Sequence, residues 1–255
     1  NKVLRVLENN GITPDFAVCL DGLHVNDSLT GLENFCSKMN CIMDLKTDNV
    51  IFSKKFRRVF VSFSKNDTVI KKLAEHNKIF TYENGGTATS MAFVSAVKMG
   101  FSKIIFSGLD LAFKGDIIYS TGEVLNKTSE NQMKVANAQK NIVKIKSVTG
   151  ELVNTRDDYA AFVQHFETLI KDLGAKEVYN TTSFGAAIEG MRNVAFNDIH
   201  LLFASTGTPF ILGEVQPFKI ETEAWAKDEL MLINNIISFL SKGIFSPALV
   251  SSIVK

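Results

Sequence analysis

Short apolar runs alternate with longer segments of helical spacing over the first 107 residues of this chain. The runs are rich in valine, isoleucine and phenylalanine, and several end in glycine or in a carboxylate, which is typical of buried strands. They predict strands at 16–20, 41–45, 58–63, 79–82 and 103–107, with helices at 2–10, 29–38, 67–75 and 87–99. Alternation of this kind predicts an α/β fold: a Rossmann-like, mostly parallel, doubly wound sheet. We expect the five strands to form one sheet.

The pattern changes after Asp110. Residues 114–139 are polar and long for a connection, which is typical of a binding loop or lid. A hairpin is predicted at 142–155 around Thr149-Gly150, then an amphipathic helix at 157–173, a strand at 177–180 and a small-residue loop at 181–190. From Phe196 the apolar spacing is mainly helical, most strongly at 221–242. We therefore expect a Rossmann-like domain over 1–195 and a helical C-terminal region over 196–255.

The composition argues against several classes of function. The formal net charge of +1 gives no overall attraction to nucleic acid or to acidic membranes, and no apolar run is long enough to span a bilayer. The cysteines lack metal-ligand spacing and the histidines are scattered, so no metal site is expected. An odd number of cysteines without a signal peptide favours reduced thiols and a cytoplasmic location.

The glycine turn between the fourth strand and its helix, Asn84-Gly-Gly-Thr-Ala-Thr-Ser90, is the strongest candidate for ligand binding. Gly85 and Gly86 would let the backbone approach a ligand, and Thr87, Thr89 or Ser90 could cap the helix while its first N–H groups face an anion. The alternative interpretation is a tight connection with ordinary helix capping.

Other candidates follow strands at the same predicted edge, where ligands bind in open α/β sheets. Gly108 and Asp110 follow the fifth strand, and Asp21 follows the first. Either carboxylate could accept a hydrogen bond from a ribose hydroxyl or could hold its own loop. Asn180, Thr181 and Thr182 open the small-residue loop, which could close a nucleotide pocket or be a structural turn.

Five blocks of sequence together resemble the bacterial motility accessory factor (Maf) family, which shares a domain with MptE-like pterin diphosphokinases. The blocks are residues 12–21, 84–90, Gly108-Leu-Asp110 with Tyr119 and Gly122 downstream, 147–155 and 178–190. The block around 87–110 is also similar to the donor-binding region of bacterial lipooligosaccharide sialyltransferases. One departure is clear: the first strand and Gly-x-Gly-Pro-Ser loop of the family are not found upstream of Ile12.

The resemblance implies a glycosyltransferase that moves a nonulosonic acid, of the sialic, pseudaminic or legionaminic type, from a CMP-sugar to serine or threonine of flagellin. No further cofactor is implied. Tyr119 could contact the phosphate or help to stabilise the leaving group, or it could simply pack within its loop. Glu83 and Asp110 are the candidate general bases, and the sequence does not choose between them.

Two other functions stay open. One is ATP-dependent diphosphoryl transfer to a hydroxymethylpterin, which needs magnesium and clustered carboxylates; the acidic residues here occur one per strand end. The other is a non-catalytic flagellin-binding module that keeps the fold without the chemistry.

Overall fold

The computed structural model describes residues 3–20, 29–47, 54, 56–79, 81, 86–113, 142–203 and 222–241. Contacts divide the chain into two compact units, the first made of 1–62 and 83–209 and the second of 63–82 and 210–255. Each unit is described by itself.

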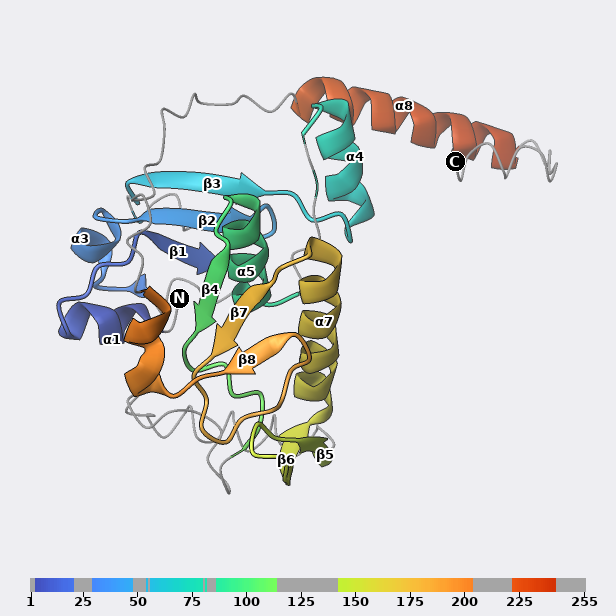
Figure 1. The fold of residues 1–255 in the computed structure, drawn as a ribbon. Coiled ribbons are helices and arrows are strands. Elements are labelled where there is room, and N and C mark those ends of the chain that lie inside the picture. Colours follow the sequence, from blue (N-terminus) through green and yellow to red (C-terminus); the bar gives the residue numbers. More distant parts are fainter. Residues whose placement is uncertain are drawn as a thin grey trace. The chain divides into compact units, whose positions relative to one another are not determined.

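A parallel sheet of three strands opens the first unit. Its strands β1 (Phe16–Cys19), β2 (Asn40–Asp44) and β3 (Arg58–Ser62) lie in that order (Figure 1). Every residue of β2 is buried, as expected for the central strand of a parallel sheet. Helices α1 (Leu4–Asn9) and α3 (Glu33–Cys36) contribute Leu4, Phe35 and Cys36 to the core of this sheet.

A second parallel sheet lies in the same unit, with strands in the order β4 (Lys103–Phe106), β7 (Glu177–Asn180), β8 (Met191–Asn193). Helices α5 (Ala88–Lys98) and α7 (Asp157–Leu173) pack on it. Phe93 of α5, Phe106 of β4 and Phe166 of α7 meet with ring centroids 5.6–6.2 Å apart. All three rings are buried, so they join both helices to the sheet.

An antiparallel hairpin, β5 (Ile142–Lys146) with β6 (Leu152–Arg156), precedes α7. Strand β8 is followed by the 3₁₀ helix η2 (Phe196–Phe203).

The second unit contains α4 (Thr68–His76) and α8 (Thr222–Ser241). Asp67 caps α4 by accepting hydrogen bonds from the amides of Val69 and Ile70, both at 3.0 Å. An ion pair of 2.9 Å between Lys72 and Glu229 joins the two helices. Within the described residues, no helix is long and apolar enough to cross a membrane.

The predicted α/β class, with mostly parallel strands and a helical C-terminal part, is confirmed. Hydrogen bonds join the described strands into two parallel sheets, and one of the five strands predicted to form a single sheet is not among them, so that prediction stays open. The strand predicted at 79–82 falls largely outside the described residues. The helix predicted at 29–38 is shorter because Gly31, at φ +78°, takes a left-handed conformation that a helix cannot continue through.

Candidate functional site

The carboxyl ends of the strands and the start of α5 define the candidate site. Helix α5 reaches β4 through only four residues, so the chain reverses and the N-terminus of α5 lies toward the carboxyl end of β4 (Figure 1). The hydroxyl of Ser62, the last residue of β3, lies 3.9 Å from the sulfur of Met91 in the first turns of α5. The end of β3 therefore lies beside the start of this helix.

The start of α5 is a capping box. The Thr87 hydroxyl accepts a hydrogen bond from the Ser90 amide at 3.0 Å, and the Ser90 hydroxyl accepts one from the Thr87 amide at 3.1 Å. Ser90 is 1% exposed, whereas Thr89 is exposed. Two of the predicted ligand-binding hydroxyls therefore also cap the helix, and Thr89 is the one left outside the cap.

Gly86 precedes this cap with a φ of +72°, a left-handed backbone that favours glycine. A Cβ atom at Gly86 would meet no other atom of the protein within 4 Å. The requirement for glycine here therefore comes from the backbone conformation and not from crowding by the protein itself.

The loops that follow β4 and β7 are joined by hydrogen bonds. Thr182 donates from its hydroxyl to Oδ1 of Asp110 at 2.6 Å, and the amide of Ala186 donates to the Asp110 carbonyl at 2.7 Å. Asn180 donates from Nδ2 to the Leu109 carbonyl at 2.8 Å. The structure thus joins the segments that contain the predicted site residues Asp110 and Asn180 through pairs that lie more than 70 positions apart in sequence.

Asp110 therefore fixes loop structure, one of the two roles considered for it, through both its carbonyl and its carboxylate. Asp110 is half-buried, and Gly108 before it has a φ of +82°. Thr181 contributes through its backbone, since its amide donates to the Phe106 carbonyl at 3.1 Å. Asn180 is 2% exposed, and its Oδ1 is a buried acceptor without a hydrogen-bond partner among the described residues.

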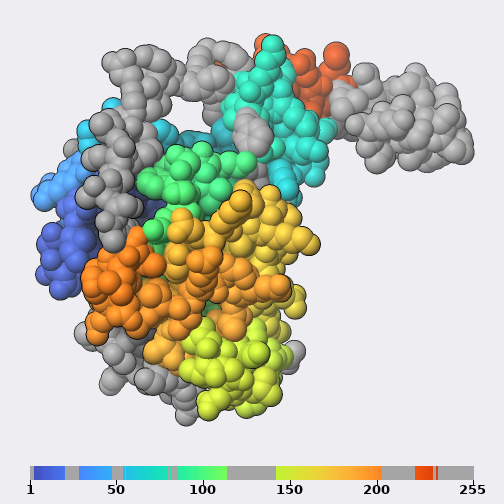
Figure 2. Space-filling model, in the orientation of Figure 1, coloured from blue at the N-terminus to red at the C-terminus, as the bar shows by residue number. Residues whose placement is uncertain are grey.

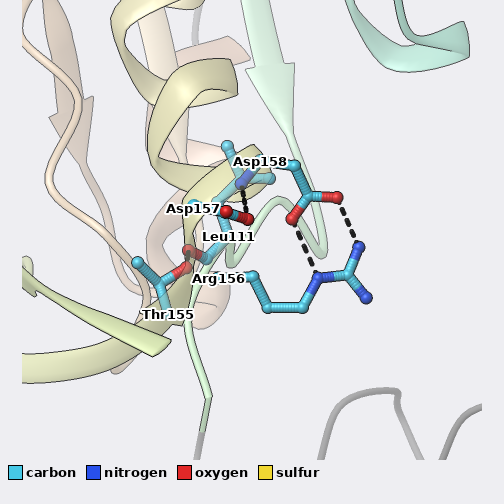
Figure 3. A network of polar contacts seen from close by, with 5 residues as sticks. All are labelled: Leu111, Thr155, Arg156, Asp157 and Asp158. Carbon is cyan, nitrogen blue, oxygen red and sulfur yellow. Dashed lines mark hydrogen bonds and ion pairs between the residues drawn. The ribbon is translucent and has the colours of Figure 1, made fainter. Parts of the chain in front are cut away.

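Leu111 and Phe113 are anchored to the hairpin (Figure 3). The Thr155 hydroxyl donates to the Leu111 carbonyl at 2.7 Å, and the Phe113 amide donates to the Asn154 carbonyl at 2.9 Å. Arg156 donates two hydrogen bonds to the carboxylate of Asp158, at 2.9 and 2.6 Å. Bidentate pairs of arginine with a carboxylate are among the stronger side-chain hydrogen bonds. The chain is therefore held in place for three residues after Asp110.

The hairpin also contacts the loop after β7. The Val148 amide donates to the Gly185 carbonyl, and the Ala187 amide donates to the Lys146 carbonyl, both at 2.9 Å. Figure 2 shows this neighbourhood on the surface, where the hairpin in yellow-green adjoins the 177–203 region in orange. Loop, hairpin and the exit of β4 form one connected structure.

Five predicted site residues lie outside the described part of the chain: Asp21, Glu83, Asn84, Gly85 and Tyr119. Their roles remain predictions.

One polar residue at a strand end, Asp44, was not selected as a site residue, and the contact of Thr182 with Asp110 was not foreseen. Asp44 ends β2 with 1% exposure, and its Oδ1 accepts a hydrogen bond from the Lys46 amide at 3.0 Å. Thr182 holds Asp110. The signal for Asp44 was available, because it follows a buried strand just as Asp21 and Asp110 do; the partner of Thr182 lies too far away in sequence to be recognised.

The three cysteines lie together in the core of the first sheet and are not joined by disulfide bonds. Burial raises the pKa of the Cys36 thiol to about 11, and a hydrogen bond with Cys19 together with burial raises the pKa of Cys41. Across the part of the chain that is described, no group of three or more histidine, cysteine or acidic residues is arranged to hold a metal ion.

The fold and the edge described above define a Rossmann-like α/β protein whose polar groups gather where parallel strands end. The family model for MptE-like proteins, described as 6-hydroxymethylpterin diphosphokinase MptE-like, matches residues 1–116. Among solved structures, the Maf glycosyltransferase from Magnetospirillum magneticum AMB-1 is similar, with a TM-score of 0.58 and 20% sequence identity over 74% of this chain. The match spans 28% of that longer protein. No curated protein matches the sequence. The predicted resemblance is thus supported by the MptE-like family model over residues 1–116 and by a fold similar to that of a Maf glycosyltransferase.

Proposed function

We propose that this protein is a glycosyltransferase that transfers a nonulosonic acid from a CMP-sugar to serine or threonine hydroxyls of flagellin in the cytoplasm. The observation that carries the proposal is the similarity in fold to a Maf glycosyltransferase over three quarters of this chain. Three of the five motif blocks that resemble the same family include residues at the start of α5 or just after β4 and β7.

The geometry suits binding of the phosphate of such a donor. The N-terminus of α5 carries a partial positive charge, and the hydrogen bonds of the described residues do not use the amides of Ala88 and Thr89. The exposed hydroxyl of Thr89 adds a donor at the same turn. A phosphodiester could therefore be neutralised here without a metal ion.

Asp110 suits a role in orienting the nucleotide, because its carboxylate is held by Thr182 and only partly buried. In the transfer, the acceptor oxygen bonds to the anomeric carbon while the bond from that carbon to the phosphate oxygen breaks. CMP leaves with the electron pair, and the hydroxyl proton passes to a base. Glu83 and Asp110 remain the two candidates for that base.

Thermal stabilisation by nucleotides tests the proposal. CMP and a CMP-nonulosonic acid should each raise the melting temperature, because a ligand that binds only the folded state stabilises it. Mass spectrometry of flagellin incubated with protein and donor should then show the added sugar mass. Stabilisation by ATP with magnesium, but not by CMP, would contradict the proposal.

That contrary result would favour a second function, diphosphoryl transfer to a hydroxymethylpterin. The description of the matching family model supports this alternative. Such a reaction requires magnesium at the phosphates, and carboxylates are its usual protein ligands. Asp21, Glu83 and Asp110 would have to supply them.

A further inference from the structure

A chain of hydrogen bonds passes through Thr182 to Asp110. The amide of Gly185 donates to Oγ1 of Thr182 at 2.9 Å, and Oγ1 lies 2.6 Å from Oδ1 of Asp110. An amide can only donate and an ionised carboxylate can only accept, so the Thr182 hydroxyl must direct its proton to Asp110. This chain fixes one carboxylate oxygen of Asp110.

The backbone on both sides of this contact is also fixed. Gly185 has no room for a side chain, since a Cβ atom would lie 2.6 Å from both the Asp110 carbonyl oxygen and Oγ1 of Thr182. The Ala186 amide donates to the same carbonyl, and Asn180 holds Leu109. Thr182 is 5% exposed and β-branched, which limits its rotamers.

The second carboxylate oxygen has a different environment. Oδ2 of Asp110 takes part in none of the hydrogen bonds among the described residues, and it is not among their buried, unpartnered atoms. With Oδ1 held and Oδ2 accessible, the carboxylate presents one oxygen in a defined direction at the end of β4.

We propose that Thr182 is a positioning residue that orients Asp110 so that Oδ2 accepts a hydrogen bond from a ribose hydroxyl of the bound nucleotide. This inference rests on the proposed function, because it takes the ligand to be a cytidine nucleotide. A carboxylate fixed in this way recognises the hydroxyl by direction as well as by charge, and a nucleotide without that hydroxyl leaves Oδ2 unpaired.

Titration calorimetry with CMP, 2′-deoxy-CMP and 3′-deoxy-CMP tests this role. The wild-type protein should bind CMP about tenfold more tightly than one of the two deoxy analogues, the difference that one good hydrogen bond gives. Thr182→Val keeps the shape of the side chain but removes its hydroxyl. In this variant the preference for CMP over the deoxy analogue should fall to the level measured in Asp110→Asn. Thr182→Ser retains the hydroxyl and should retain the preference.

A purely structural role would give a different result. Loss of packing would weaken all three nucleotides equally and leave their ratio unchanged, so an unchanged ratio in folded Thr182→Val would overturn the proposal. Thr182→Ala serves as the second hydroxyl-free variant should Thr182→Val not fold. Absence of CMP binding in the wild-type protein would overturn the proposed function and this role with it, whereas normal CMP binding without any preference overturns the role of Thr182 alone.

Discussion

At the scale of single residues, the glycines of the site are required for two different physical reasons. Gly86 and Gly108 have positive φ angles and open space around them, so backbone conformation selects them. Gly185 has an ordinary φ, but its missing side chain admits the carbonyl of Asp110. Substitutions at Gly86 and Gly108 should therefore strain the backbone, whereas a substitution at Gly185 should create a steric clash.

Gly86→Val should weaken CMP binding at least tenfold. The added side chain would project where the ligand approaches, and the left-handed backbone would cost about 1–2 kcal/mol of stability. Gly174→Val is the matched control, since Gly174 has φ +63°, equally open space and a place at the C-terminus of α7. Calorimetry on both variants should show a loss of affinity only in Gly86→Val, and equal affinities would mean that the turn is merely structural.

Cys36 should make the protein less stable at alkaline pH. Its folded pKa of about 11 lies above the ordinary value of 9, so the unfolded chain releases the proton first. The contribution to stability is complete below pH 9 and falls as the pH rises toward 11, at about 1.4 kcal/mol per pKa unit. Urea unfolding between pH 8 and 11 should show a steeper decline in the wild-type protein than in Cys36→Ala, and parallel curves would contradict this.

At the scale of elements, helix α5 depends on its capping box more than on the charges of its first turn, which contains no acidic residue. The box satisfies amides that would otherwise lack partners at the start of the helix. Binding of an anion at the same turn would act on the amides that the box leaves unused.

Thr87→Ala should therefore lower the free energy of unfolding by about 1 kcal/mol, the usual effect of losing an N-cap. Thr89→Ala changes an exposed hydroxyl outside the cap and should change stability by less than about 0.5 kcal/mol. Thr89→Ala should nevertheless weaken CMP binding if that hydroxyl contacts the phosphate. Denaturant titrations with equal shifts for both variants would show that the cap is not the stabilising contact.

At the scale of the whole molecule, the proposed site would hold a phosphate without a metal ion. The acidic residues described at the strand ends, Asp44 and Asp110, accept hydrogen bonds from the protein itself. Helix-terminal contacts with an anion typically contribute about 0.3–1 kcal/mol each.

Binding of a CMP-sugar should consequently be independent of divalent cations. Calorimetry should give the same affinity in EDTA as in magnesium, because in the proposed site backbone amides and hydroxyls would neutralise the phosphate. A strict magnesium requirement together with preference for ATP would promote the pterin diphosphokinase alternative.

The local sequence determined most of the helices and strands. The helix at 157–173 has the predicted bounds, and α5 begins after the expected cap at Thr87, because helix periodicity and capping depend on residues within one or two turns. Strand β8 was not predicted, since Met191–Asn193 is too short to carry a pattern of its own. It forms only because it pairs with β7.

The order of the strands and the role of Asp110 depended on tertiary structure. The sequence placed Asp110 at the end of a strand but left open whether it binds a ligand or holds a loop. Thr182 and Ala186 lie more than 70 positions away, and only the pairing of β4 with β7 brings them to Asp110. Local patterns thus determined most of the helices and strands, whereas the contacts that orient a carboxylate arise from segments that meet only after the sheet has formed.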